Sequence, residues 1–156
     1  MSAESLPADD AGLPEVKSAP LVLVVDDDEA IREWVVEGLA LSGFRVAEAV
    51  DGRDALAKAV EIVPDVVLTD LQLPGLDGWD LISQLKHDPR TSHTRFIAMT
   101  GFSLDGAARQ RARACGCDAF LAKPCLPETI ALEVRLVMQS GHLPIDDPSE
   151  MGGERE

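Results

Sequence analysis

Polar residues at four places far apart in the sequence could together carry out phosphate chemistry. Each place lies at the end of a short apolar run, over 21–25, 65–69, 96–100 or 119–122. The residues are Asp26, Asp27, Asp28, Asp70, Thr100 and Lys123. If the runs are parallel strands of one sheet, these side chains meet at the carboxyl edge, where ligands bind in such folds.

The chemistry open to this set is metal-assisted phosphoryl transfer. Two like charges about 4 Å apart repel by on the order of 4 kcal/mol at an effective dielectric of about 20, so clustered carboxylates favour a bound cation. Oxygen ligands with room for water suit Mg2+. Asp70 could then attack phosphorus as a nucleophile, while Lys123 and the Thr100 hydroxyl contact phosphoryl oxygens.

A simpler explanation exists for the acidic run after the first strand. Acids in this position often form a solvated turn or cap a helix, and we expect Asp28 and Glu29 to do so. A threonine or a lysine at a single strand end carries no functional signal either. The coincidence at four strand ends is what favours a site.

The elements that must position these residues alternate along the chain. We predict strands over 21–25, 45–49, 65–69, 96–100 and 119–122, separated by helical segments and by Gly and Pro breaks. Five strand–helix pairs predict an α/β, doubly wound fold, in which helices cover both faces of a mostly parallel sheet.

The composition limits the number of domains and the kinds of partner. The 156 residues fit one ordinary domain, and 28 acids against 14 bases give a net charge of −14. This excess of acids argues against binding to nucleic acid or to anionic membranes. Residues 1–20 and 140–156 are acidic and contain Pro and Gly, so we expect disordered tails around a domain at 21–139.

The expected location is the cytoplasm. The three cysteines form no disulfide framework, which indicates a reducing compartment. The chain has no apolar run long enough to span a membrane and no basic, apolar leader at its start.

Four motifs resemble the receiver domain of two-component response regulators. They are VLVVDDDEAIR (22–32), VVLTDLQLPGLDGWDL (66–81), FIAMTG (96–101) and AFLAKP (119–124). The resemblance covers 21–139 and implies a flavodoxin-like (βα)5 fold. It also implies a phosphoacceptor regulator rather than an enzyme. Such a regulator takes a phosphoryl group from a phosphohistidine on a sensor histidine kinase or a histidine phosphotransfer protein.

The resemblance assigns roles to the matching residues at the sheet edge. Asp70 matches the phosphoacceptor, and Lys123 matches the invariant lysine of the family. Asp26, Asp27, Asp70 and the backbone carbonyl of Gln72 match the Mg2+ ligands.

The resemblance also implies a conformational switch. Thr100 matches the switch hydroxyl, and Phe120 stands where the family often has a tyrosine. Pro124 matches a proline that usually follows a cis bond. A downstream protein partner is expected on residues 103–139, and homodimer formation stays open. The arginines at 109, 111 and 113 form either a solvated stripe or a docking patch on that surface.

Two other functions stay open from the residues. Asp26 and Asp28 resemble the nucleophile and acid/base of haloacid-dehalogenase-type phosphatases, whose further acidic pair is matched only by Asp146-Asp147 in the C-terminal tail. A receiver-like module that is never phosphorylated is the other alternative. We expect a stand-alone, single-domain regulator without a DNA-binding output domain.

Overall fold

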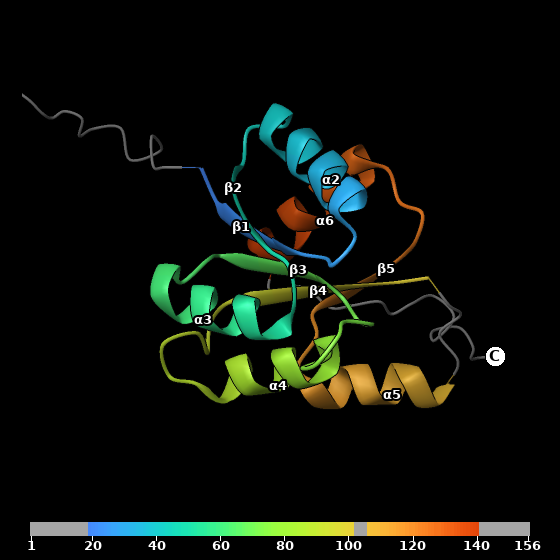
Figure 1. Cartoon of the computed structure of the whole chain (residues 1–156). Coiled ribbons are helices and arrows are strands. Elements are labelled where there is room, and N and C mark those ends of the chain that lie inside the picture. The colour runs from blue at the N-terminus through green and yellow to red at the C-terminus, as the bar shows by residue number, and fades with distance from the viewer. Residues whose placement is uncertain (1–18, 102–105, 141–156) are drawn as a thin grey trace, which may run out of the picture.

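The computed structural model describes residues 19–101 and 106–140, which form a three-layer α/β domain (Figure 1). In chain order the elements are β1 (Leu21–Val25), α2 (Glu29–Leu41), β2 (Arg45–Ala49), α3 (Gly52–Ile62), β3 (Val66–Asp70), α4 (Gly78–His87), β4 (Arg95–Thr100), α5 (Gly106–Cys115), β5 (Ala119–Ala122) and α6 (Pro127–Ser140). The five strands are all parallel, in the order β2-β1-β3-β4-β5. The predicted doubly wound, flavodoxin-like fold is confirmed.

Each face of the sheet buries its own apolar cluster. Alternate strand residues such as Val24 and Leu68 point toward α2 and α6, whereas Leu23 and Val67 point toward α3, α4 and α5. Strand β3 is buried along its whole length, because helices cover it on both sides. The central strands are therefore rigid supports for the residues at their ends.

Three of the helices begin in the same way. Asp28, Asp51 and Asp77 precede α2, α3 and α4, and each carboxylate accepts the backbone N–H three residues later at 2.8–3.1 Å. Such N-caps satisfy donors that the first helical turn leaves free. The predicted capping role of Asp28 is confirmed.

Some element boundaries differ from the prediction by one or two residues. Strand β3 begins and ends one residue later, so Asp70 is its last residue and pairs with Met99 of β4. Helix α6 continues to Ser140, one residue beyond the predicted end of the domain. The carbonyls of Ala19 and Pro20 accept hydrogen bonds from Arg45, so these two residues are held beside β2 rather than in a free tail.

The predicted tails lie largely outside the described residues. The same holds for residues 103–105 at the start of the expected partner surface. Within 19–101 and 106–140, none of the helices is both long and apolar enough to cross a lipid bilayer.

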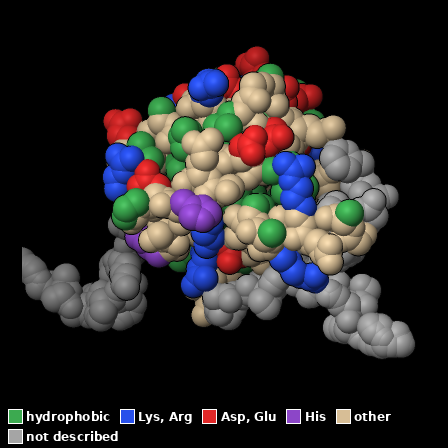
Figure 2. Space-filling view, turned by 90° about the horizontal axis from the view of Figure 1, so that it is seen from below, with side chains coloured by type: hydrophobic (Ala, Val, Ile, Leu, Met, Phe, Trp, Pro, Cys, Tyr) green, Lys and Arg blue, Asp and Glu red, His purple; other side chains and the backbone are tan. Residues whose placement is uncertain are grey.

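The basic residues that the structure describes are spread over the face built by α3, α4 and α5. Figure 2 shows this face, where Lys and Arg side chains are scattered among other residues. Several of them are engaged within the domain, as when Lys58 pairs with Asp54 and Arg90 with Asp88. The basic side chains that the structure describes on this face do not join into a continuous surface of the kind that binds nucleic acid.

Candidate functional site

The acidic turn after β1 is fixed by hydrogen bonds of its own. The Asp26 carboxylate accepts the N–H of Asp28 at 2.9 Å, and the Asp28 carboxylate caps α2 at Ile31. Asp26 is fully buried, whereas Asp27 is exposed. The turn thus offers one buried and one accessible carboxylate side by side.

The second part of the site is the end of β3. Oδ1 of Asp70 accepts the N–H of Gln72 at 3.0 Å, which orients the carboxylate above the carboxyl edge of the sheet. Asp70 is only 8% exposed. Strands β1 and β3 are neighbours, and the chain leaves them in opposite directions, so this edge is the topological switch point of the sheet.

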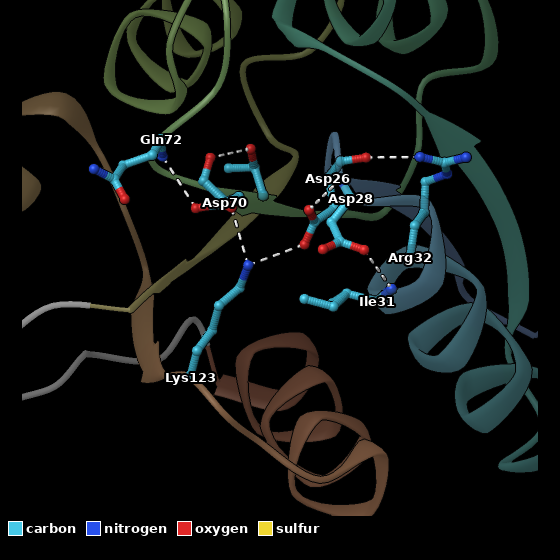
Figure 3. Close-up of polar contacts among 8 residues, drawn as sticks. Asp26, Asp28, Ile31, Arg32, Asp70, Gln72 and Lys123 are labelled. Carbon is cyan, nitrogen blue, oxygen red and sulfur yellow. Dashed lines mark hydrogen bonds and ion pairs between the residues drawn. The ribbon is translucent and has the colours of Figure 1, made fainter.

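Lys123 joins the two parts. Its ammonium donates to Oδ2 of Asp26 at 3.1 Å and to Oδ2 of Asp70 at 2.9 Å, although these partners are 97 and 53 positions away in the sequence (Figure 3). Oxygens of Asp26, Asp27 and Asp70 lie within 4.8 Å of one another. The structure therefore brings these four residues to one place, as predicted.

The charges of this cluster hold Lys123 protonated. Partial burial alone lowers the pKa of the ammonium, but hydrogen bonds and attraction from Asp70 and Asp26 outweigh burial, so its pKa lies above the ordinary value. Lys123 is a permanent cation at neutral pH. Its single positive charge pairs with two of the three carboxylates and offsets only part of their negative charge.

Thr100 and Phe120 lie where the sequence places them. Thr100 ends β4, is 1% exposed, and accepts the Lys123 N–H at its backbone carbonyl at 2.8 Å. Phe120 is half-buried in β5 and packs against the cluster under α3, α4 and α5. The expected cis bond between Lys123 and Pro124 is present. The switching roles of Thr100 and Phe120 stay predictions.

A groove of about 560 Å³ adjoins the acidic cluster on the side of α4 and α5. It is lined by Asp27, Gln72, Asp77, Trp79 and Arg111 among others. The Arg111 guanidinium lies 4.6 Å above the Trp79 ring, a cation–π contact that joins α5 to α4. Arg111 is exposed and rests on Trp79, and the Arg109 side chain lies outside the described residues. Whether the arginines of α5 form a solvated stripe or a docking patch stays a prediction.

The cysteines take no visible part in this site. Burial raises the pKa of Cys117 to about 12, so its thiol is neutral and unreactive at ordinary pH. Cys115 and Cys117 pack under α3, α4 and α5, and Cys125 packs on the other face.

One residue of the site was not predicted. Arg32 on α2 donates to the backbone carbonyl of Asp26 at 2.8 Å and to Glu48 of β2 at 3.0 Å. The helical spacing could place Arg32 near the start of α2. A bond to a main-chain oxygen, however, depends on the path of the turn and leaves no pattern in residue types.

The sequence that builds this site matches a known protein family. The family model described as the response regulator receiver domain matches residues 22–135. The chain belongs to this receiver domain family. Every residue of the acidic cluster, together with Thr100 and Lys123, falls inside the matched range.

Other receiver-containing proteins are similar over most of this chain. It is 33% identical to the DNA-binding dual master transcriptional regulator RpaA of Synechocystis, over 77% of this chain and 49% of that protein. It is 34% identical to the polar-differentiation response regulator DivK of Brucella anthropi, over 66% of this chain and 83% of that protein. The chain thus spans about half the length of RpaA, but most of DivK.

Solved receiver structures share the fold. The Vibrio cholerae chemotaxis protein CheY4 aligns with a TM-score of 0.71 and 31% identity, over 75% of this chain and 97% of the CheY4 chain. The receiver domain of a Syntrophus aciditrophicus histidine kinase aligns equally well at 28% identity, over 83% of this chain and 95% of that one.

The residues at the receiver's acidic edge suit a divalent cation. The three carboxylates converge within 4.8 Å, offer only oxygen atoms, and include the exposed Asp27, which leaves room for water. A buried acid such as Asp26 beside two others also needs positive charge, which Lys123 supplies only in part. The donor set therefore fits Mg2+.

Proposed function

We propose that this receiver is the phosphoacceptor of a two-component system or phosphorelay, with Asp70 as the residue that becomes phosphorylated. The observation that supports this most is the bridge from Lys123 to Asp70 and Asp26, with Asp27 beside them. Asp70 has a nucleophilic oxygen at the edge of the sheet, and the Lys123 ammonium lies 2.9 Å from Oδ2 of this carboxylate. No other carboxylate of this cluster lies at the end of β3, between the acidic turn and β4.

The proposed reaction is a transfer between two side chains. A carboxylate oxygen of Asp70 attacks the phosphorus of a phosphohistidine on a kinase or a histidine phosphotransfer protein. A P–O bond forms, the P–N bond breaks, and the imidazole nitrogen takes its electron pair back and accepts a proton. The Lys123 ammonium and the Thr100 hydroxyl bind phosphoryl oxygens and so stabilise their charge.

Mg2+ would be held by Asp26, Asp27, Asp70 and the carbonyl of Gln72, and when bound it neutralises charge on the transferred group. Gln72 is already tied to Asp70 through its N–H. The burial of Asp26 and Asp70 at the sheet edge keeps these two carboxylates in place, so that they would present a preformed set of oxygen ligands to the ion.

Phosphorylation would change the affinity of this receiver for a protein partner through Thr100 and Phe120. The related proteins are named for transcription, polar differentiation and chemotaxis, so they support a signalling role without selecting one output. We propose the partner surface on α5, β5 and α6. The proposed location is the cytoplasm, and formation of a homodimer stays open.

We propose a regulator rather than an enzyme with a separate substrate. In the phosphatase alternative Asp28 would act as the general acid and base. Its carboxylate instead caps α2 at Ile31, which turns it toward the helix. Asp26, the nucleophile of that alternative, is fully buried and bound by Lys123 and Asp28.

Transfer from a phosphohistidine donor tests this function. When a histidine phosphotransfer protein carrying a labelled phosphoryl group is mixed with the chain and Mg2+, the label should move from its phosphohistidine to the chain. Asp70→Asn should take no label, while Asp28→Asn, which can still cap α2, should take it normally. A chain that stays unlabelled with several such donors, and with a small phosphodonor, would overturn the proposal.

A further inference from the structure

The side chain of Arg32 points back toward the acidic turn rather than into solvent. It is only 11% exposed. Its Nη1 donates to the backbone carbonyl of Asp26 at 2.8 Å, and its Nε donates to Oε1 of Glu48 at 3.0 Å. Figure 3 shows Arg32 and Lys123 reaching Asp26 from different sides.

The carbonyl that Arg32 holds has a special place in the site. It belongs to the peptide unit that joins Asp26 to Asp27. Because a peptide unit is planar, holding its oxygen fixes the direction in which the chain enters Asp27. The N–H of Asp28 is held in turn by the Asp26 carboxylate. Arg32 thus controls the part of the turn that carries the exposed ligand.

Arg32 is itself anchored to the sheet. Glu48, its second partner, lies near the end of β2, and the carbonyl of Glu48 accepts the Lys58 ammonium of α3 at 2.7 Å. The N–H of Asp26 donates to Ala49, the next residue of β2, at 3.3 Å. The turn, β2 and α3 are therefore tied together on the side of the site away from Lys123.

We propose that Arg32, held by Glu48, is a positioning residue for the Mg2+ site, which keeps the Asp26–Asp27 peptide oriented so that the Asp27 carboxylate stays beside Asp26 and Asp70. This inference rests on the proposed function. An exposed ion pair with Glu48 alone would contribute little. The bond to the main chain of the site, made by a rigid, forked guanidinium, is what gives Arg32 its role.

Calorimetric titration with Mg2+ alone tests the proposal. Arg32→Gln and Arg32→Lys should each bind Mg2+ about tenfold more weakly than the wild type, as is common when a group supporting metal ligands is lost. The lysine variant keeps the charge but not the fork. Arg135→Gln is the matched control, because Arg135 also donates to a backbone carbonyl, that of Ser42 at 3.1 Å, far from the acidic turn. Its Mg2+ affinity should not change.

A spectroscopic measurement separates positioning from general stability. In amide NMR spectra without Mg2+, the Asp27 and Asp28 signals should shift in both Arg32 variants and stay unchanged in Arg135→Gln. If an Arg32 variant does not fold, Glu48→Ala serves instead, because the Glu48 side chain is 45% exposed and the arginine remains. Glu48→Ala should weaken Mg2+ binding by a smaller factor than the Arg32 variants do, because the arginine remains and loses only one of its two partners.

Wild-type affinity in Arg32→Lys or in Glu48→Ala would overturn the inference, since charge or the arginine alone would then suffice. Failure of the proposed function looks different. In that case the wild-type chain itself neither binds Mg2+ nor accepts a phosphoryl group. If the wild type does both and the variants match it, only the role of Arg32 is wrong.

Discussion

At the edge of the sheet, hydrogen-bond donors fix the orientation of the carboxylate side chains. Asp26 and Asp70 each use one oxygen for a backbone N–H and the other for the Lys123 ammonium. Both carboxylates are nearly buried, so these contacts replace hydration that burial removes. Lys123 is the group on which the geometry of the cluster depends most.

Replacing this lysine should therefore destabilise the metal-free protein. Lys123→Met leaves two buried carboxylates facing each other. We expect the free energy of unfolding to fall, but by less than the roughly 3–5 kcal/mol that breaking a fully buried pair costs, because the Lys123 side chain is 20% exposed. Urea denaturation without Mg2+ measures this loss. Saturating Mg2+ should restore most of it, because the ion supplies the missing positive charge.

Arg90→Met is the matched control for that measurement. Its side chain is 63% exposed and pairs with Asp88, which has no part in the acidic cluster, so its removal should leave the free energy of unfolding nearly unchanged, with no effect of Mg2+. Equal costs in the two variants would contradict a special role for Lys123.

The raised pKa of Lys123 predicts a loss of stability in alkali. The ion pairs contribute fully below the pKa of an unfolded lysine, about 10.4, and the contribution disappears as the pH rises through the higher pKa of the folded state. Above about pH 10.4 the unfolding free energy should fall more steeply in the wild type than in Lys123→Met. Parallel pH profiles of the two proteins would count against the ion pairs.

Sequence reasoning reached most of these residues because they stand at strand ends. Asp26, Asp70 and Lys123 could be placed together once the runs before them were recognised as parallel strands. Arg32 could not, because its partner is a main-chain oxygen whose position depends on the folded turn. The Trp79–Arg111 contact was missed for a similar reason, since it joins two different helices.

At the scale of elements, the loop between β3 and α4 fits tightly under the site. A methyl group at Gly78, the first residue of α4, would meet the carbonyl oxygen of Asp70 and lie 2.8 Å from Cα of Leu71. The N–H of Gly78 also donates to the Leu71 carbonyl at 3.1 Å. The close approach of α4 to the end of β3 thus needs glycine.

Gly78→Ala should push the end of β3 away from α4. We expect an overpacking cost of about 1–3 kcal/mol and weaker Mg2+ binding, because Asp70 and Gln72 move with the loop. Urea denaturation and Mg2+ titration measure the two effects.

Gly106→Ala is the comparison variant, because none of the described residues has an atom within 4 Å of the added methyl group at the start of α5. It should leave stability unchanged or slightly higher. If Gly78→Ala behaved like Gly106→Ala, the tight fit would have no energetic importance.

The strands were easier to predict than the helical faces. An uninterrupted apolar run such as 21–25 has few alternatives to a buried strand. In α2, however, Val35 and Leu39 are buried while Trp34 is 45% and Leu41 82% exposed. Residue type and spacing alone do not show which of these side chains are buried, because burial depends on where α6 packs.

For the whole molecule, the acidic cluster should couple stability to Mg2+. A ligand that binds only the folded state stabilises it by about 2.7 kcal/mol at a concentration of about 100 Kd. The wild-type chain should therefore show a midpoint of thermal unfolding that rises with Mg2+ concentration.

Asp27→Asn should change the free energy of unfolding differently without and with Mg2+. Without Mg2+ it removes one of three like charges, and the unfolding free energy should rise by up to about 1 kcal/mol. With Mg2+ it should gain little further stability, because a ligand is lost. Asp28→Asn, outside the cluster, should follow the wild type in both conditions, and a loss of stability in metal-free Asp27→Asn would contradict the account.

The most direct test of the account is to locate the acyl phosphate. The chain is incubated with a small phosphodonor and Mg2+, and borohydride then reduces any acyl phosphate to an alcohol that mass spectrometry can place. The account predicts reduction at position 70 in the wild type with Mg2+, and none when Mg2+ is removed or in Asp70→Asn. Reduction at Asp26, or at no aspartate, would contradict it.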